Sequence, residues 1–320
     1  MLEKELKVLE IINKRSKISQ REIAVEAEIS IGKSNSIIKY LLEKDYIRVE
    51  KNARKSSYLL NEKALEALEE YIKGAANMKM LVSQQVEKKI NYAVILAAGE
   101  RSEFEKPIGF LPLGEINVIE RLLYQLKECA IENIIIVTGY ESHYYEKLAK
   151  NNDVQLVHNE AYRWTGTMAS LSKAKEFIKD DFLLIEGDMV FENRAIREVL
   201  NNKNRDCALI TTSSGSGDEV FVELKNGFLY KLSKDIHQFN RVDGEMIGIT
   251  KLSIDIYNKM LEEFKHNENP YLNYEYLLLD MARTYNIGYV KIEDLVWSEI
   301  DTKWHYNNLI NYIYPKIYDK

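Results

Sequence analysis

A turn of small residues with an arginine just beyond it is the feature of this sequence best suited to chemistry. An apolar, strand-like run ends in Leu96-Ala97-Ala98-Gly99, and Arg101 follows two residues later. Side chains this small let backbone N–H groups approach a triphosphate closely, and a guanidinium suits phosphate oxygens. Small residues at a strand end also serve close packing, so later segments must decide between the two uses. We predict a nucleotide site at this turn.

The elements that must position this turn follow a regular pattern from residue 90 onward. Strands are predicted over residues 92–96, 133–138, 154–158, 182–186, 207–212, 220–224 and 246–250. Helices are predicted over residues 118–128, 142–151, 166–178, 193–202, 254–264 and 274–284. Buried strands alternating with amphipathic helices are typical of a sheet covered on both faces. Residues 90–320 are therefore predicted to form an α/β domain with a mixed, mainly parallel, Rossmann-like sheet covered by helices.

The first 75 residues predict a separate, small α+β domain. Residues 2–12 have helical spacing, Ser19 and Glu22 form a capping box for a second helix, and Ser30 caps a third. Two strands joined by a basic tip follow. This order resembles a winged helix-turn-helix of the MarR type, and the matching text is ISQREIAVEAEISIGKSNSIIKYLLEKDYI. A helix from residue 62 to about 71 closes the domain, and residues 76–89 are predicted to be a linker.

That resemblance implies a DNA-reading surface. The third helix would lie in the major groove with its apolar residues, Leu42 among them, facing inward, and the hairpin tip would meet phosphate. The candidate DNA contacts are Lys33, Ser34, Ser36, Lys39, Arg54 and Lys55. A docking or dimerisation module is the alternative use of the same fold. Winged helices act in pairs on two-fold sites, so a homodimer is expected.

Composition limits the remaining possibilities. The chain has 320 residues, 46% of them hydrophobic, which is ample for two cores. Residues 1–75 hold 15 Lys or Arg and 13 Asp or Glu, a balance that permits DNA binding without requiring it. The N-terminus opens a charged helix and no apolar run could span a bilayer, so we expect a cytoplasmic protein without a membrane partner. Cys129 and Cys207 are expected to be reduced thiols.

The text VILAAGERSEFEKPIGFLPLGEINVIERLLYQLKECAIENIIIVTGY resembles the opening of the sugar nucleotidyltransferase superfamily. Within it, the chain is most similar to the bacterial cytidylyltransferases of the phosphocholine and aminoethylphosphonate type. Two later pieces, LLIEGDMVF and VWSEIDTKWHY, match that family's strand ending in Gly-Asp and its E-I-D element. The resemblance implies an enzyme that joins CTP, or another nucleoside triphosphate, to a small phosphorylated or phosphonylated acceptor.

Such a reaction brings two anions together, so it needs cations where the new phosphorus–oxygen bond forms. Mg²⁺ is the expected cofactor, because it binds one or two carboxylates and fills its other positions with phosphate oxygens and water. Asp188 follows an apolar strand and so falls where open α/β sheets place ligands. Asp301 belongs to the E-I-D element. The resemblance implies that Asp188 and Asp301 are the metal ligands.

Arg101 and Lys106 are the candidate catalytic cations. The family has a longer G-x-G-[ST]-R loop, whereas this chain has Gly99-Glu100-Arg101, so the arginine must approach from a different angle. The family's lysine aligns with Ile108. Lys106, two residues earlier, is the candidate substitute, and without it the site lacks a cation that steadies the phosphates.

Further nucleotide contacts are expected where glycine lets the base approach a strand end, at Gly139 and Tyr140. The family's N-x-x-S-L element leads into a helix and contacts nucleotide or acceptor. Here it is represented by Thr167 and Ser170, with threonine in place of asparagine. An ordinary capped helix is the alternative explanation of this segment.

Aromatic and acidic residues are the candidates for the acceptor site. An aromatic box for a quaternary ammonium is one possibility, but aromatic residues on helices and strands are usually core. The family's phosphocholine enzymes have N-E-W-F where this chain has Asp218-Glu219-Val220-Phe221, so the cage tryptophan is replaced and a primary amine or phosphorylated alcohol is favoured over choline. The candidate acceptor contacts are Trp164, Asp218, Glu219, Phe221, Tyr276 and Glu299.

Three functions remain open at this point. The favoured one is a cytidylyltransferase that activates a small acceptor for decoration of surface polysaccharide or lipid. The second is a transcription regulator whose nucleotidyltransferase domain senses a nucleotide conjugate without turnover, which the isoleucine at position 108 favours. The third is a sugar-1-phosphate nucleotidyltransferase.

Overall fold

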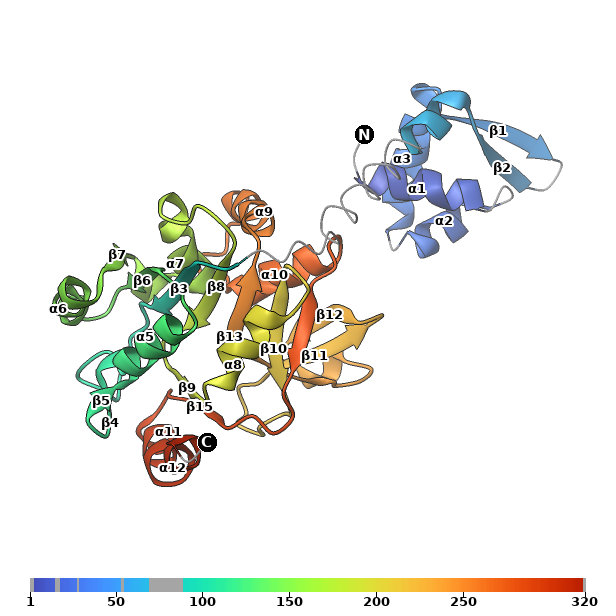
Figure 1. Cartoon of the computed structure of the whole chain (residues 1–320). Helices are drawn as coiled ribbons and strands as arrows, with labels where there is room; N and C mark the ends of the chain where they lie inside the picture. The colour runs from blue at the N-terminus through green and yellow to red at the C-terminus, as the bar shows by residue number, and fades with distance from the viewer. Residues whose placement is uncertain (1–2, 15–17, 28, 53–54, 69–88, 319–320) are drawn as a thin grey trace. The chain divides into compact units, whose positions relative to one another are not determined.

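The computed structural model describes residues 3–14, 18–27, 29–52, 55–68 and 89–318. The chain divides into two compact units, Met1–Leu81 and Val82–Lys320, which we describe separately (Figure 1). Of the linker predicted at residues 76–89, only Lys89 lies within the described residues. No helix in the described part of the chain is long and apolar enough to cross a membrane.

The first unit has the order of elements that the sequence predicts. Three helices, α1 (Glu3–Lys14), α2 (Gln20–Glu26) and α3 (Ile31–Glu43), precede an antiparallel hairpin of β1 (Ile47–Asn52) and β2 (Lys55–Leu60). The capping box is present, because Ser19 accepts from the N–H of Glu22 while the Glu22 carboxylate accepts from the N–H of Ser19. Residues 62–68 are helical. The core is aliphatic, with Leu9, Ile23 and Leu41 fully or almost fully buried.

Two details of the third helix differ from the sequence prediction. Ser34 is fully buried and its hydroxyl donates to the carbonyl of Gln20, so it does not point toward DNA. Leu42, expected to face inward, is 37% exposed. Spacing alone placed these residues on the wrong face, because α2 packs over the start of α3 and needs a small, hydrogen-bonded residue there. Lys33, Ser36 and Lys39 are exposed, as predicted.

The hairpin tip is the other predicted DNA contact. Arg54 lies outside the described residues, and of Lys55 only the backbone, at the start of β2, is described.

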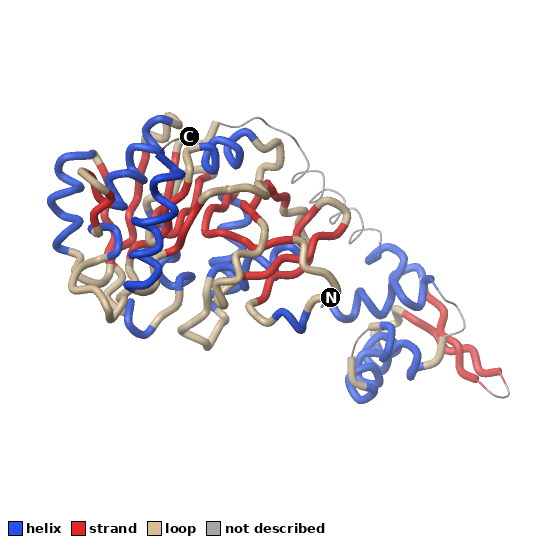
Figure 2. Tube along the Cα trace, turned by 90° about the horizontal axis from the view of Figure 1, so that it is seen from below, coloured by secondary structure: helices blue, strands red, loops and turns tan. Residues whose placement is uncertain are grey.

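A nine-stranded mixed sheet forms the centre of the second unit (Figure 2). The strands β8, β3, β6 and β7 are all parallel, and β13 joins them antiparallel through β8. On the far side of β13, β11 pairs with β12 and β10 pairs with β14. The bounds are β3 (Tyr92–Ala97), β6 (Asn133–Thr138), β7 (Val154–His158), β8 (Phe182–Glu186), β10 (Cys207–Thr211), β11 (Val220–Lys225), β12 (Phe228–Ser233), β13 (Gly244–Leu252) and β14 (Gly288–Lys291).

Helices cover both faces of this sheet. One core holds Ile95 of β3 together with apolar residues of α5 (Val118–Glu128), α6 (His143–Asn152) and α8 (Arg194–Asn201). The other holds Val94 together with α7 (Thr167–Lys173), α9 (Ile254–Lys265) and α10 (Tyr274–Ala282). Neighbouring residues of β3 therefore point to opposite faces, as the pleat requires. The two-sided α/β architecture predicted from the sequence is confirmed.

Short elements that the sequence did not predict bring the end of the chain back to the sheet. Strand β9 (Met189–Phe191) pairs antiparallel with β15 (Trp297–Glu299). Helices α11 (Lys303–Asn308) and α12 (Tyr314–Tyr318) then pack their apolar residues against the hairpin of β4 (Pro112–Leu113) and β5 (Ile116–Asn117). The pairing matters for function, because it places Glu299 opposite Met189, next to Asp188.

Both cysteines are free thiols, as expected, and Cys207 is fully buried.

Candidate active site

The site is built where two parallel strands end side by side. Strand β3 leads into the small-residue turn, and β8 leads into Gly187 and Asp188. The N–H of Gly187 donates to the carbonyl of Leu96 at 2.8 Å. A Cβ at Gly187 would lie only 2.9 Å from that oxygen, so glycine is what allows the two chain segments to meet. Asp188 is thereby held beside the turn that carries Arg101.

Arg101 joins the two aspartates that the sequence analysis selected. Its Nη2 atom lies 3.0 Å from Asp188 Oδ2 and 2.8 Å from Asp301 Oδ1. The backbone supports this arrangement, because the N–H of Ile300 donates to the carbonyl of Asp188 at 2.9 Å. Asp188 and Asp301, which follow Arg101 by 87 and 200 positions in the sequence, thus meet at its guanidinium.

Burial and the neighbouring charges shift the pKa of Arg101, and that of Asp188, in opposite directions. Burial lowers the pKa of Arg101, but Asp188 and Asp301 together with two nearby glutamates raise it further, and the net shift is upward. Burial raises the pKa of Asp188, and the Arg101 guanidinium counteracts this only in part. The guanidinium therefore stays charged, whereas burial opposes the ionised form of Asp188.

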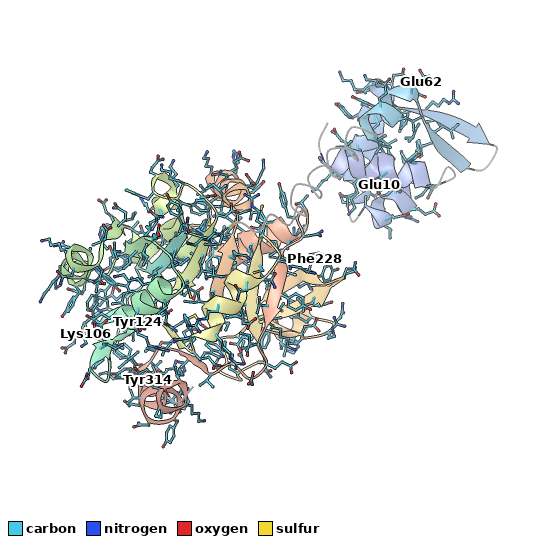
Figure 3. The ribbon with its side chains drawn as sticks, viewed as in Figure 1. Glu10, Glu62, Lys106, Tyr124, Phe228 and Tyr314 are labelled. Atoms are coloured by element: carbon cyan, nitrogen blue, oxygen red, sulfur yellow. The ribbon has the colours of Figure 1, made fainter. Side chains whose placement is uncertain are left out.

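A first pocket lies over the turn and contains the predicted nucleotide residues Leu96, Ala97 and Gly99. Arg101, Asp188 and Tyr145 also line it, the last with a buried ring. Ile108 lines the same pocket, at the place where the family has its lysine. Lys106, labelled in Figure 3, is half-buried and lines neither this pocket nor the acidic pocket described below.

The rest of the predicted nucleotide surface lies on the other side of the turn. The N–H of Tyr140 donates to the carbonyl of Ala98 at 3.0 Å. A Cβ at Gly139 would lie 2.5 Å from that same carbonyl and 2.6 Å from Tyr162, so this approach requires glycine. Glu100, unusual for the family loop, forms a two-bond ion pair with Arg163 at 2.7 and 3.3 Å.

Thr167 and Ser170 are engaged within the protein. The N–H of Thr167 donates to Asn273 Oδ1, and its hydroxyl accepts from the N–H of Tyr274. Ser170 is buried and accepts from Asn159. Thr167 thus ties the start of α7 to the start of α10, and Ser170 ties α7 to Asn159, which gives both residues a positioning role in this structure.

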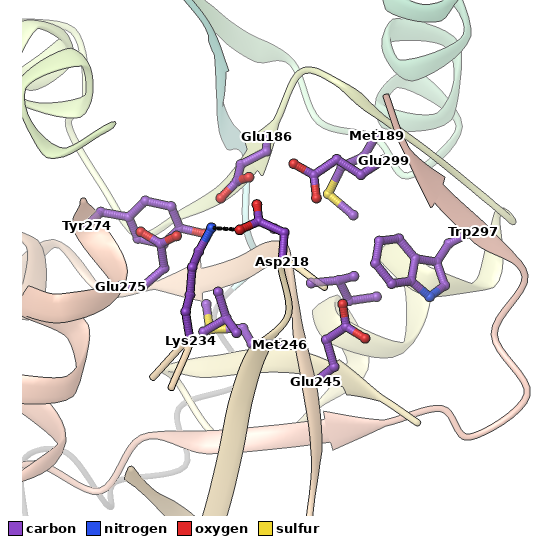
Figure 4. Close-up of a pocket in the computed structure, with 13 residues that line it drawn as sticks. Glu186, Met189, Asp218, Lys234, Glu245, Met246, Tyr274, Glu275, Trp297 and Glu299 are labelled. Carbon is purple, nitrogen blue, oxygen red and sulfur yellow. Dashed lines mark hydrogen bonds and ion pairs between the residues drawn. The ribbon is translucent and has the colours of Figure 1, made fainter. Parts of the chain in front are cut away.

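A second pocket opens beside Asp188 and is strongly acidic (Figure 4). Five carboxylates line it, whereas Lys234 is its one cation among the described residues. Lys234 pairs with Asp218 at 2.7 Å. We call this the acidic pocket. Its carboxylates are Glu186, Asp218, Glu245, Glu275 and Glu299.

Three of these carboxylates were not selected from the sequence: Glu186, Glu245 and Glu275. A signal for Glu186 was present, since it stands two residues before Asp188 at the end of the same strand. Gly248 on β13 makes room for it, because a Cβ there would lie 2.7 Å from the Glu186 side chain. Glu275 had no comparable signal, because its position depends on how α10 packs against the sheet.

Crowding of negative charge raises the pKa of these groups. Burial raises the pKa of Glu186 well above its usual range, and Glu275, Asp188 and Glu299 add to the effect. Burial, followed by repulsion from Asp188 and Asp301, raises the pKa of Glu299 to about 8. Burial raises the pKa of Glu275 as well. Any cation that enters such a pocket reduces the repulsion among its carboxylates.

The donor set fits a divalent cation. Glu186, Asp188 and Glu299 each offer an oxygen, and these oxygens lie within 4.8 Å of one another. Asp188 Oδ1 is buried and has no hydrogen-bond partner among the described residues. Carboxylate oxygens of this kind are what Mg²⁺ prefers. Asp301 is not one of these three carboxylates, and the Arg101 guanidinium bridges it to Asp188.

The predicted acceptor residues divide into two sets. Asp218 and Glu299 line the acidic pocket. The other four do not: Trp164 is 68% exposed, Tyr276 is 44% exposed, Phe221 packs against Phe239, and Glu219 is buried, where it accepts from the N–H of Gly217. Charge is therefore the main character of this pocket, whose aromatic lining residues are Tyr274 and Trp297.

Comparison with known proteins agrees with this geometry. Residues 93–246 match the family of MobA-like NTP transferase domains, and residues 1–48 match the winged helix-turn-helix DNA-binding family. The chain is 25% identical over 232 residues to the choline-phosphate cytidylyltransferase of Haemophilus influenzae, covering 70% of this chain and 97% of the relative. It is also 25% identical over 241 residues to the bifunctional protein GlmU of Methanococcus maripaludis, covering 71% of this chain but only 56% of that longer protein.

A solved structure shares the fold. The inositol-1-phosphate CTP transferase from T. maritima superposes with a TM-score of 0.63 at 16% identity, covering 72% of this chain and 98% of that one. The two sequence matches fall on the two units found in the structure. The chain therefore carries a MobA-like NTP transferase domain with cytidylyltransferase homologues, a nucleotidyltransferase enzyme fused to an N-terminal winged helix-turn-helix domain.

Proposed function

We propose that the protein is a Mg²⁺-dependent cytidylyltransferase that joins CTP to a small phosphorylated or phosphonylated primary amine. The observation that carries this proposal is the juxtaposition of two pockets at Asp188. The first, with Arg101, is suited to a triphosphate, and the acidic pocket is suited to a cationic acceptor. The homologue that acts on choline phosphate supports cytosine as the base and a cationic acceptor as the partner.

Three carboxylates of the acidic pocket lack an ion-pair partner among the described residues, which favours a positively charged acceptor. Asp218 is neutralised by Lys234, and Glu245 accepts from the N–H of Ser214. Glu186, Glu275 and Glu299 have no ion-pair partner within 4 Å among the described residues. Lys234 and Thr167 favour the ionised form of Glu275, but its Oε2 is buried without a hydrogen bond. A primary ammonium offers three N–H donors to such oxygens, whereas a quaternary ammonium offers none. We therefore favour a primary amine over choline.

The chemistry needs positioning and positive charge rather than a base. A phosphate or phosphonate oxygen of the acceptor attacks the α-phosphorus of CTP, and the bond from that phosphorus to the bridging oxygen breaks to release pyrophosphate. The attacking oxygen is already ionised, so no proton has to be removed. A phosphate acceptor gives a CDP conjugate and a phosphonate acceptor gives a CMP conjugate.

The chain's residues have distinct tasks in this reaction. The turn at Ala97–Gly99 offers backbone N–H groups to the triphosphate, and Arg101 neutralises charge on the departing pyrophosphate. Asp188 and Glu299 of the three-carboxylate group, with Asp301 on the other side of Arg101, would hold Mg²⁺, which would neutralise the phosphate oxygens where the new bond forms. Glu186, the third member of that group, also lines the acidic pocket, where it and Glu275 bind the ammonium and so orient the acceptor.

The winged helix adds a second, regulatory activity to the proposal. Lys33, Ser36 and Lys39 are exposed on α3, which would lie in the major groove of DNA. A homodimer would present two such helices to a two-fold site. We place the protein among those that supply activated conjugates for surface polysaccharide or lipid and that respond to their supply.

The test is pyrophosphate release by the full chain with Mg²⁺, four nucleoside triphosphates and a panel of acceptors. The panel contains a phosphorylated primary amine, an aminoalkyl phosphonate, choline phosphate and a sugar 1-phosphate. We expect the highest kcat/KM for CTP with one of the first two acceptors. Preference for the sugar phosphate would refute the ammonium argument. Tight binding of a nucleotide conjugate without turnover of any pair would instead favour the sensor, in keeping with Ile108 in the nucleotide pocket.

A further inference from the structure

Arg101 occupies the position between two carboxylates that the reaction assigns to a metal. Its Nη2 atom is shared by Asp188 Oδ2 at 3.0 Å and Asp301 Oδ1 at 2.8 Å. The protein itself therefore already supplies a cation, Arg101, to the two aspartates. No other Lys or Arg in the described residues lies within 4 Å of either aspartate, and His305 Nδ1 lies 3.6 Å from Asp301 Oδ2.

The hydrogen bonding of Arg101 is incomplete in this state. Its Nε is buried and has no partner among the described residues, although a guanidinium offers five N–H donors. Arg101 also lines the nucleotide pocket, next to the small residues of the turn. Gly99 lies against the guanidinium, because a Cβ there would be in van der Waals contact with Arg101 Nη1, at 3.7 Å. A phosphate oxygen there would give Arg101 the acceptor that it lacks.

From these contacts we propose that Arg101 is a built-in counterion that blocks metal binding until the nucleotide arrives. In the free protein Arg101 holds one oxygen of each aspartate, so a divalent ion that would bind between Asp188 and Asp301 meets a guanidinium that occupies that place and repels it. The triphosphate gives Arg101 a second set of anionic partners, so it turns from the aspartates to the phosphates. The carboxylates are then released, and metal and nucleotide bind as one unit. This inference rests on the proposed function of the site.

The prediction is a strong coupling between the two ligands that depends on Arg101. The test uses Mn²⁺ as the probe. Free Mn²⁺ is measured by electron paramagnetic resonance while the full-length protein is titrated without nucleotide, and then with CTP in the absence of acceptor, and a protein-free titration subtracts the Mn²⁺ that CTP chelates in solution. The wild-type protein should bind Mn²⁺ weakly alone and at least tenfold more tightly with CTP. The Arg101→Gln variant should bind Mn²⁺ at least tenfold more tightly than wild type without CTP, and CTP should add little.

Two further variants control for charge and folding. Arg241→Gln removes an arginine that also pairs with an aspartate, Asp243 at 2.8 Å, but lies outside both pockets. It should bind Mn²⁺ as wild type does. Arg101→Lys keeps the charge and should restore weak Mn²⁺ binding. Circular dichroism and the thermal midpoint of each variant show whether the fold is retained.

The possible failures are distinct. If Arg101→Gln and wild type bind Mn²⁺ equally without nucleotide, Arg101 is not a counterion that competes with the metal, and the inference is wrong while the proposed function stands. If wild type binds Mn²⁺ equally well with and without CTP, the coupling is absent and the inference is again wrong. If no nucleoside triphosphate changes Mn²⁺ binding and none is bound, the proposed function itself fails.

Discussion

Replacing Glu186 with glutamine tests the ammonium site with the smallest change of shape. Glu186 lies at the floor of the acidic pocket, in space that Gly248 leaves open, so glutamine fits the same volume. The substitution removes one charged partner of the acceptor's ammonium group. A hydrogen bond to a charged group is worth about 1.5–3 kcal/mol, and 1.4 kcal/mol corresponds to a factor of about ten. We therefore expect kcat/KM for the amine acceptor to fall by about 10- to 150-fold.

The pH dependence gives this prediction a second readout. The pKa of Glu186 is raised, mainly by burial, so the free enzyme holds a proton there above the usual range of a glutamate. Binding an ammonium favours the ionised form and releases that proton. The affinity of wild type for the acceptor should therefore rise with pH as Glu186 ionises, until the amine itself loses its charge. In Glu186→Gln this rise should be weaker.

The assay measures pyrophosphate release at saturating CTP as the acceptor concentration is varied. An alkyl phosphate of the same length without the amine is the control acceptor, and Glu186→Gln should leave its kcat/KM unchanged or raise it. KM for CTP should also be unchanged. An equal loss with the amine and with the alkyl phosphate would refute an ammonium site, because it would show that Glu186 acts on a group common to both acceptors.

Three further predictions concern other parts of the molecule. Gly139→Ala places a Cβ 2.5 Å from the carbonyl of Ala98, and overpacking of this kind costs about 1–3 kcal/mol, so KM for CTP should rise while KM for the acceptor does not. Burial raises the pKa of Asp206 to about 6, so ionisation of this side chain destabilises the fold as pH rises from about 4 to above 6. Over that interval the free energy of unfolding of Asp206→Asn should therefore gain up to about 3 kcal/mol relative to wild type, measured by urea unfolding at both pH values. Lys33→Ala with Lys39→Ala should weaken DNA binding by the full chain, measured by fluorescence anisotropy, and unchanged binding would contradict the placement of α3 against DNA.

The sequence predicted the parts of this fold that depend on local pattern. Strands at residues 133–138, 154–158 and 182–186 and the helix at residues 118–128 have the predicted bounds, because buried apolar runs and capping residues mark their ends. The pairing of β9 with β15 was not predicted, since three-residue strands carry no periodicity. That pairing is what brings Glu299 to Asp188.

The candidate site was predictable where a motif carried it. The turn before Arg101, Asp188 and the E-I-D element identified three residues that the structure joins through one guanidinium. The acidic pocket was not predictable to the same degree, because Glu245 and Glu275 reach it from separate elements through tertiary packing. The aromatic candidates Trp164 and Tyr276 fell outside it for the same reason: composition shows that aromatic residues are present, but not where they face.

The most direct measurement is the rate of nucleotide transfer by the Asp188→Asn variant. Asp188 contacts Arg101, lines the nucleotide pocket and offers its free Oδ1 to the metal group, so its charge is common to every part of the proposed chemistry. With CTP, Mg²⁺ and the preferred amine acceptor, wild type should form the conjugate and pyrophosphate in equal amounts. Asp188→Asn should be slower by at least about 100-fold at saturating substrates. A variant that keeps the wild-type rate would contradict the assignment of this site.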